Sequence, residues 1–255
     1  GQPYLPGSSF KGALRTILAV AAAKELQPDV RINRLNSKRA WAAQPIEEFL
    51  FGRDPTHNFL RVLQVGDSAP VTAKNLRLRR AHIYPTAAPT SRGKSRGLDI
   101  DLEVVAKDTT FELPIHSPLE LLKPSVGQFE VRRREELGDW ERRVSWIEKL
   151  AAHGRAFARG QLIEEVTYFQ TRTDVPAAHH FYNRLVDQFQ QLQKHQFMVR
   201  LGWGGGWHTK TLGAYLRQDA ANFAAIVEKY KLNPTGKAPP GAPFPLSRHL
   251  LRRPD

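Results

Sequence analysis

A glycine-rich segment near the C-terminal end of the chain carries two tryptophans between cationic side chains. It reads RLGWGGGWHTKT at positions 200–211, and four of the five residues from 202 to 206 are glycine. Glycine accepts positive φ angles and lets a ligand approach the backbone, so amides can surround a phosphate while indole rings stack on bases. The alternative is a tight turn whose tryptophans pack in the core. Because glycines and cations occur together, we expect binding of a nucleic-acid backbone by Gly202, Trp203, Gly204, Gly205, Gly206, Trp207, His208 and Lys210.

A second candidate motif, PGSSFKGALR, occupies positions 6–15. Apolar residues recur at helical spacing from 10 to 21, which predicts a helix capped by one of the two serines. Free amides and the helix dipole attract a phosphate at such an end. Ala-Leu replaces the Lys-Ser/Thr pair that a nucleotide hydrolase requires. A capped surface helix is an equally good interpretation of this segment alone. The candidate phosphate ligands are Ser8, Ser9, Lys11 and Arg15.

A third candidate is the basic linker at 86–97, which has the composition of a mobile hairpin tip. Its Arg92, Lys94 and Arg96 are expected to bind RNA, with a solvated flexible loop as the alternative. The whole chain supports a polyanionic partner. It has 255 residues, a net charge of +13 and a pI near 10.2.

Composition also excludes several classes of site and location. There is no cysteine, which excludes disulfides, thiolate zinc sites and cysteine nucleophiles. No stretch provides the ~18 uninterrupted apolar residues of a membrane span. We therefore expect a soluble, cytoplasmic protein without membrane contact, cofactor or metal.

The elements that must position these motifs divide the chain into three stretches. Residues 60–131 are β-rich, with candidate strands at 61–65, 72–84, 98–104 and 110–115. Residues 139–230 are helical, with helices expected to start near 139 and to span 177–196 and 214–230. The tail 233–255 is rich in proline, with a strand or helix from 247. We expect a single α+β module over 1–255.

Two groups of side chains suggest catalysis without completing a catalytic set. Asp99, Asp101 and Glu103 share one strand face and could hold a metal ion, although a solvated face is the simpler interpretation. His208 could act as a general base, but no partner acid is evident and a phosphate contact is favoured. We therefore expect no catalytic residues and no enzyme activity.

Three motifs together resemble the RAMP superfamily of CRISPR proteins. They are PGSSFKGALR at 6–15, LRVLQVGDS at 60–68 and the glycine-rich segment at 200–211. Their order and the Thr-Lys-Thr end of the last motif are most similar to the fifth Csm subunits of type III-A complexes. The resemblance implies a modified ferredoxin-like, RRM-type core with helical insertions, which in this chain lacks its first strand.

The resemblance also implies a role in CRISPR RNA maturation and antiviral defence. Such a subunit caps the complex where the 3′ region of the CRISPR RNA is held, beside the backbone and small subunits, and it does not cleave the target. Target RNA stays open as a further partner. The alternatives are a CRISPR-RNA-processing endoribonuclease of the same superfamily, or a sibling type III subunit that holds another part of the RNA.

Overall fold

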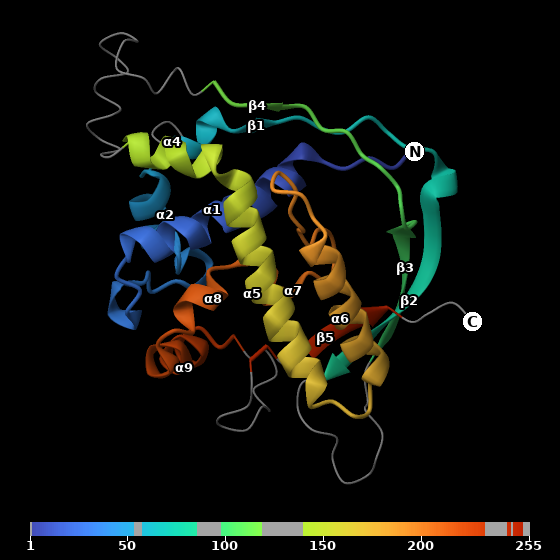
Figure 1. The fold of residues 1–255 in the computed structure, drawn as a ribbon. Coiled ribbons are helices and arrows are strands. Elements are labelled where there is room, and N and C mark those ends of the chain that lie inside the picture. The colour runs from blue at the N-terminus through green and yellow to red at the C-terminus, as the bar shows by residue number, and fades with distance from the viewer. Residues whose placement is uncertain are drawn as a thin grey trace.

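The computed structural model describes residues 2–53, 58–85, 98–118, 140–232, 244–245 and 247–251. Helices fill the middle of this part of the chain, and small antiparallel sheets lie along its edges (Figure 1). In chain order the elements are α1 (Gly7–Leu26), η1 (Ile32–Arg34), η2 (Arg39–Trp41), α2 (Gln44–Phe51), η3 (Phe59–Val62), β1 (Gln64–Val65), η4 (Ala73–Asn75), β2 (Leu76–Pro85), β3 (Asp99–Val105), β4 (Ile115–His116), α4 (Trp140–Glu148), α5 (Leu150–Gln170), α6 (Pro176–Gln190), α7 (Gly206–Lys210), α8 (Gly213–Leu216), α9 (Ala220–Lys229) and β5 (Ser247–Leu251).

Helix α1 forms because its sequence is rich in alanine and leucine and repeats apolar residues every three to four positions. The expected stripe is confirmed at Leu14, Ile17 and Leu18, which are almost completely buried. The expected serine cap is wrong: Pro6 is the N-cap, and Ser8 and Ser9 lie inside the helix, which begins at Gly7. The helix ends where Gln27 adopts a left-handed conformation and donates its N–H to the Ala23 carbonyl.

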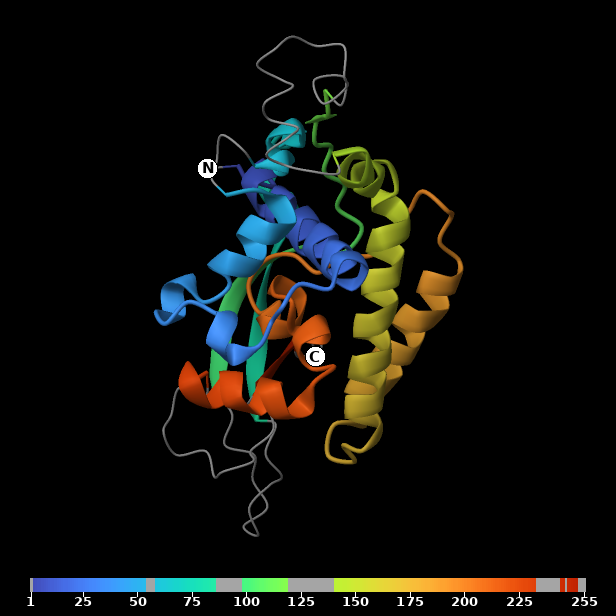
Figure 2. The ribbon, with the colours of Figure 1, turned by 90° about the vertical axis from the view of Figure 1, so that its left-hand side faces the viewer.

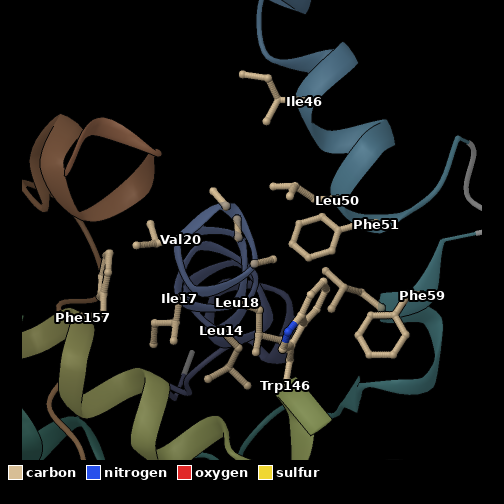
Figure 3. Close-up of a cluster of buried hydrophobic side chains, with 14 of the residues drawn as sticks. Leu14, Ile17, Leu18, Val20, Ile46, Leu50, Phe51, Phe59, Trp146 and Phe157 are labelled. Atoms are coloured by element: carbon tan, nitrogen blue, oxygen red, sulfur yellow. The ribbon is translucent and has the colours of Figure 1, made fainter. Parts of the chain in front are cut away.

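The main hydrophobic core is built around α1 (Figure 3). Leu50 and Phe51 of α2 pack on one side of the helix, and Phe59 and Trp146 meet edge to face with ring centroids 6.2 Å apart. The Trp146 indole donates its N–H to Glu25 Oε2 at 2.8 Å, so this buried ring leaves no polar atom unpaired. Truncating Leu14 to alanine in such a core costs about 2–5 kcal/mol.

Helix α5 lies between α1 and α6 and connects two cores (Figure 1). Its Phe157 packs toward α1, whereas Leu162 and Phe169 pack with Tyr182 of α6. We expected α6 to place Phe181 inside, and this is wrong. Phe181 is 47 % exposed and its neighbour Tyr182 is buried, whereas Leu185 and Phe189 pack against the second core as expected.

Helix α6 also ends at Gln190 rather than at 196. Instead of one helix over 214–230, the chain forms α8 and α9. The break occurs where the side chain of Asp219 accepts the N–H of Asn222 and caps α9.

The strands form one sheet in the order β3-β2-β5 and a smaller sheet of β1 and β4, all antiparallel. Strand β3 alternates between exposed and half-buried positions as expected, whereas in β2 the expected apolar face is wrong at Leu78, which is 69 % exposed. The acidic face of β3 is exposed as expected. Two of its acids have cross-strand partners, because Asp101 pairs with Arg80 at 2.8 Å and His82 Nδ1 lies 2.7 Å from Asp99 Oδ1.

Other expected strands are shorter or differ in type. The segment 61–65 divides between the end of η3 and the two-residue strand β1, and Ile115–His116 is the strand near 110–115. The mixed helix-and-sheet class is confirmed, and the ferredoxin-like core stays a prediction. In the part of the chain that the structure describes, no helix is long and apolar enough to cross a membrane.

Candidate functional site

A cleft of about 720 Å³ brings the first and third sequence motifs together. One wall is the face of α1 that carries Ser8, Ser9 and Arg15, and the opposite wall is the glycine-rich segment from Arg200 to Leu212. Helices α2, α8 and α9 supply most of the floor. Of the expected site residues, the lining includes Ser8, Ser9, Arg15, Gly202, Trp207 and Lys210.

The middle motif holds the N-terminal motif in place. The Gly7 N–H donates to Asp67 Oδ1 at 2.7 Å, and the Leu5 N–H donates to Ser68 Oγ at 2.9 Å. A Cβ at Gly7 would lie 2.4 Å from the Val65 carbonyl oxygen, so glycine is required here. Because Asp67 already occupies the first amide of α1, an external phosphate has fewer free donors there than we expected.

The two cations expected to bind phosphate on α1, Arg15 and Lys11, lie in different environments. Arg15 lines the cleft and pairs with Glu47 of α2 at 2.7 Å. Lys11 lies outside the described cleft lining, and partial burial lowers the pKa of its amine. Ser8 and Ser9 are exposed at the cleft, where their hydroxyls are accessible.

The glycine-rich segment uses its glycines as expected at three of four positions. Gly202, Gly204 and Gly206 have φ angles of +80°, +77° and +76°, which side-chain-bearing residues rarely adopt. Gly205 is instead restricted by space, since a Cβ there would lie 2.9 Å from Thr209 Oγ1. Lys210 closes the segment by donating from Nζ to the Gly202 carbonyl at 3.2 Å, with its side chain still exposed.

The two tryptophans have different surroundings. Trp203 is 53 % exposed and packs one side of its ring on His249, with ring centroids 4.5 Å apart. Trp207 packs against Phe223 and Phe244, with ring centroids 5.5 and 5.0 Å away. Trp203 therefore leaves much of its ring exposed for stacking. Trp207 is half-buried against two rings and also lines the cleft, so the alternative of a tryptophan packed in the core holds only in part.

His208 is turned inward, which contradicts the expected phosphate contact of its side chain. The residue is 7 % exposed, with Nδ1 lying 3.1 Å from Glu164 Oε1 and Nε2 lying 3.4 Å from an Arg248 nitrogen. Burial lowers the pKa of His208 to about 4 even though Glu164 opposes the decrease. The imidazole is therefore neutral near pH 7, and it supplies no charge for a phosphate.

His208 belongs to a buried charge cluster that the sequence interpretation missed. Arg217 donates two hydrogen bonds to Glu164 at 2.6 and 2.7 Å, and Arg248 donates to Glu165 at 3.0 Å. Burial raises the pKa of Glu165, while Arg248 and then Arg200 oppose the increase. We use the term buried charge cluster for Glu164, Glu165, His208, Arg217 and Arg248.

The sequence held one signal of this cluster. Glu165 lies three positions after Leu162 and four before Phe169, and so falls on the buried face of α5. A carboxylate on an apolar stripe predicts a buried cationic partner. Its identity, Arg248, is 83 positions away and follows only from the tertiary fold.

Two further cations line the cleft. Arg200 opens the glycine-rich segment but was not among the expected ligands, and Arg39 was missed because no local pattern distinguishes it from other surface cations. Three expected RNA ligands, Arg92, Lys94 and Arg96, lie outside the described residues. Within the described residues, no three histidine, aspartate or glutamate side chains gather into a possible metal site.

Comparisons with known proteins give a family and a fold. Residues 1–208 match the family model of the RAMP superfamily. The chain is similar to one in the cryo-EM structure of a Csm–crRNA–target RNA ternary complex of a type III-A CRISPR–Cas system. The TM-score is 0.71 at 22 % identity, and the match covers 98 % of this chain and 70 % of that one.

It is also similar to the crystal structure of Csm5 from T. onnurineus. Here the TM-score is 0.54 at 22 % identity, over 86 % of this chain and 66 % of the other. Both similarities concern the fold. A comparison of the sequence with curated proteins finds no match.

Proposed function

The chain belongs to the RAMP superfamily, and we propose that it is a non-catalytic subunit that binds CRISPR RNA in a type III-A effector complex. The observation that carries this proposal is the cleft, in which the glycine-rich segment faces α1 across a rim of cations. Arg15, Arg39, Arg200 and Lys210 line the cleft against a single acid, Glu47. This excess of positive charge suits a phosphate backbone.

The proposal extends to the position of the subunit. We place it at the end of the complex that holds the 3′ region of the CRISPR RNA, next to the backbone and small subunits and in reach of target RNA. The similarity in fold to a chain of a Csm–crRNA–target RNA complex and to a Csm5 structure supports this position. A ferredoxin-like core belongs to the same proposal.

Absence of catalysis is supported by the state of the histidine in the glycine-rich segment. A general base must reach the proton that it removes. His208 is buried, has a low pKa and lies against Glu164 and Arg248, outside the described lining of the cleft. Its neighbour Glu164 nevertheless provides the acid partner that an endoribonuclease would use, so cleavage has to be tested directly.

The binding test is a salt titration of the purified full chain with single-stranded CRISPR RNA. If the four rim cations contact phosphates, log K falls with log salt at a slope of about −2.8, taking roughly −0.7 per contact. Lys210→Ala should reduce the steepness by about 0.7. The matched control is Lys107→Ala, because Lys107 is 87 % exposed in the turn after β3 and does not line the cleft. A shallow slope that neither variant changes would contradict phosphate binding in the cleft.

Two further measurements separate the alternatives. Incubating the chain with repeat RNA, with and without chelator, should produce no cut. A cut that disappears in His208→Ala would establish the endoribonuclease instead. In the assembled complex, a guide carrying 4-thiouridine in its 3′ portion should crosslink to this chain more than a guide labelled in its 5′ portion. Preferential 5′ crosslinking would identify a sibling subunit.

A further inference from the structure

The cleft is deeper and more apolar than a phosphate backbone needs. Besides its cations, the lining includes partly exposed apolar side chains, among them Ala13 of α1, Leu201, Leu212 and Leu216. Ile46, Leu50 and Phe51 of α2 border the cleft, but they belong to the core around α1 and have almost no exposed surface (Figure 3). Backbone phosphates stay hydrated and contact cations at a surface, so they do not account for this apolar lining.

The dimensions and the lining fit a ligand with an apolar part and an anionic part. A volume of about 720 Å³ lies in the range of pockets that enclose small organic ligands. The lining also carries the exposed hydroxyls of Ser8 and Ser9 in addition to its cations. A nucleotide has this combination, because its flat base is apolar on both faces and its phosphate is charged.

We propose that the cleft takes an unstacked nucleobase of the bound RNA, while the rim cations hold the phosphates on either side of it. This inference rests on the proposed function and adds how the RNA is held. Removing one base from the stack costs least when the RNA is already single-stranded. The rim favours this occupant over an apolar peptide side chain, which would gain nothing from four cations around one carboxylate.

The apolar lining also brings the C-terminal helices next to the two RNA-binding motifs. Leu212 and Leu216 lie directly after the glycine-rich segment, and both line the cleft together with Tyr230. A base inserted between these side chains and α1 would contact both motifs at once. The subunit would then fix the register of the RNA, in addition to attracting its charge.

The test compares intact RNA with RNA that lacks one base. The probe is a single-stranded decaribonucleotide, together with a set in which an abasic nucleotide replaces each position in turn. For the unchanged chain we expect one position at which the abasic RNA binds about tenfold more weakly. Thr16→Trp should fill the cleft from α1 and abolish that difference, with little change in the salt slope.

Two variants control for folding and local damage. Gly12→Ala lies on the same face of α1, and its Cβ would have no atom within 4 Å, so it should keep the tenfold difference. Ala43→Trp fills the cleft from the exposed start of α2 and serves if Thr16→Trp melts early. Circular dichroism and thermal melting establish that each variant is folded.

The outcomes separate this inference from the proposed function. Steep salt dependence with equal binding of all abasic RNAs would overturn the base pocket and leave phosphate binding intact. Absence of salt-dependent RNA binding would overturn both. If the filling variants leave RNA binding unchanged and release the chain from its complex, the occupant is a side chain of a neighbouring subunit and the base pocket is wrong.

Discussion

The buried charge cluster and the cleft lie on either side of the same glycine-rich segment, and they use arginine in opposite ways. In the cluster, Arg217 and Arg248 each have a carboxylate partner, Glu164 and Glu165. In the cleft, Glu47 is the single acid of the described lining and pairs with Arg15, while Arg39, Arg200 and Lys210 line the cleft without a carboxylate beside them. The surrounding acids therefore decide whether a cation stabilises the fold or is available to a ligand, although the arginines themselves look alike in the sequence.

Burial sharpens this difference. The paired side chains of Glu165 and Arg248 are each 9 % exposed, whereas those of Arg15 and Glu47 are 42 % exposed. A charge buried without a partner is strongly destabilising, and an exposed ion pair contributes little to stability. We therefore expect changes in the cluster to act on stability and changes in the cleft to act on binding.

The largest effect should come from Glu165→Gln. The substitution keeps the shape of the side chain but leaves Arg248 buried without a carboxylate, which costs about 3–5 kcal/mol. Denaturant unfolding at pH 8 measures the loss. Asp101→Asn is the control, because its pair with Arg80 is exposed and should contribute at most about 1 kcal/mol. Equal losses in the two variants would remove the distinction between buried and exposed pairs.

The cluster should also make stability depend on pH. Unfolded His208 takes up a proton below its ordinary pKa of 6.5, whereas the folded residue does so only near 4. Between these values the unfolded chain binds more protons, so stability is fully present above pH 6.5 and falls as the pH is lowered toward 4. The loss approaches about 3 kcal/mol for this pKa difference.

Melting temperatures between pH 7 and pH 4 measure this dependence, and His208→Gln should flatten part of it. Burial also lowers the pKa of His153 and His249, so some dependence should persist in the variant. A His208→Gln protein with an unchanged pH profile would show that His208 is accessible to solvent. That result would also weaken the contrast between cluster and cleft.

Substitution of Gly204 tests the glycine-rich segment, which contributes residues to both the cleft and the buried charge cluster. The φ of +77° at Gly204 disfavours any side chain, and a Cβ would lie 3.3 Å from His249 Cβ, so Gly204→Ala should cost about 1–2 kcal/mol. Thermal melting measures the cost. Gly12→Ala should instead stabilise α1 by about 0.5–1 kcal/mol, because its Cβ meets open space inside a helix. A neutral Gly204→Ala would mean that the segment adopts another backbone conformation in solution.

The spacing of apolar residues predicted those helices and strands whose buried face follows a regular repeat. The stripe of Leu14 and Ile17 predicted α1, and the alternation along β2 and β3 predicted their hairpin. The stripe of α6 failed at its first position because Phe181 and Tyr182 both fit a helical repeat with the later apolar residues. Only packing against Phe169 of α5, with ring centroids 5.4 Å apart, selects Tyr182.

The sequence predicted the part of the candidate site that depends on glycine residues. It did not predict the residues that reach the site from distant parts of the chain. Positive φ angles at Gly202, Gly204 and Gly206 follow from their residue type. The serine cap failed because Asp67, sixty positions away, takes the first amide of α1. Arg39 and Glu47 reach the cleft only because α2 packs on α1, which no local pattern reports.

The smallest expected effect concerns RNA affinity and comes from Glu47→Gln. This substitution should strengthen RNA binding, whereas Glu165→Gln and Gly204→Ala should weaken the fold. Glu47 is the single acid among the described residues of the cleft, where it partly neutralises Arg15. Removing its charge should strengthen RNA binding about two- to fivefold, while stability changes by less than about 1 kcal/mol because the pair is exposed. Arg15→Gln should weaken binding by a similar factor, since it removes a cation and leaves the acid facing the RNA.

Fluorescence anisotropy with labelled single-stranded RNA, at two salt concentrations, measures both variants of the Arg15–Glu47 pair. Raised salt should reduce the two effects together, because exposed charges are screened. If Glu47→Gln weakens binding instead, the carboxylate orients Arg15 toward the RNA. The cleft would then depend on its ion pair just as the buried charge cluster does, and the contrast between the two regions would be one of burial alone.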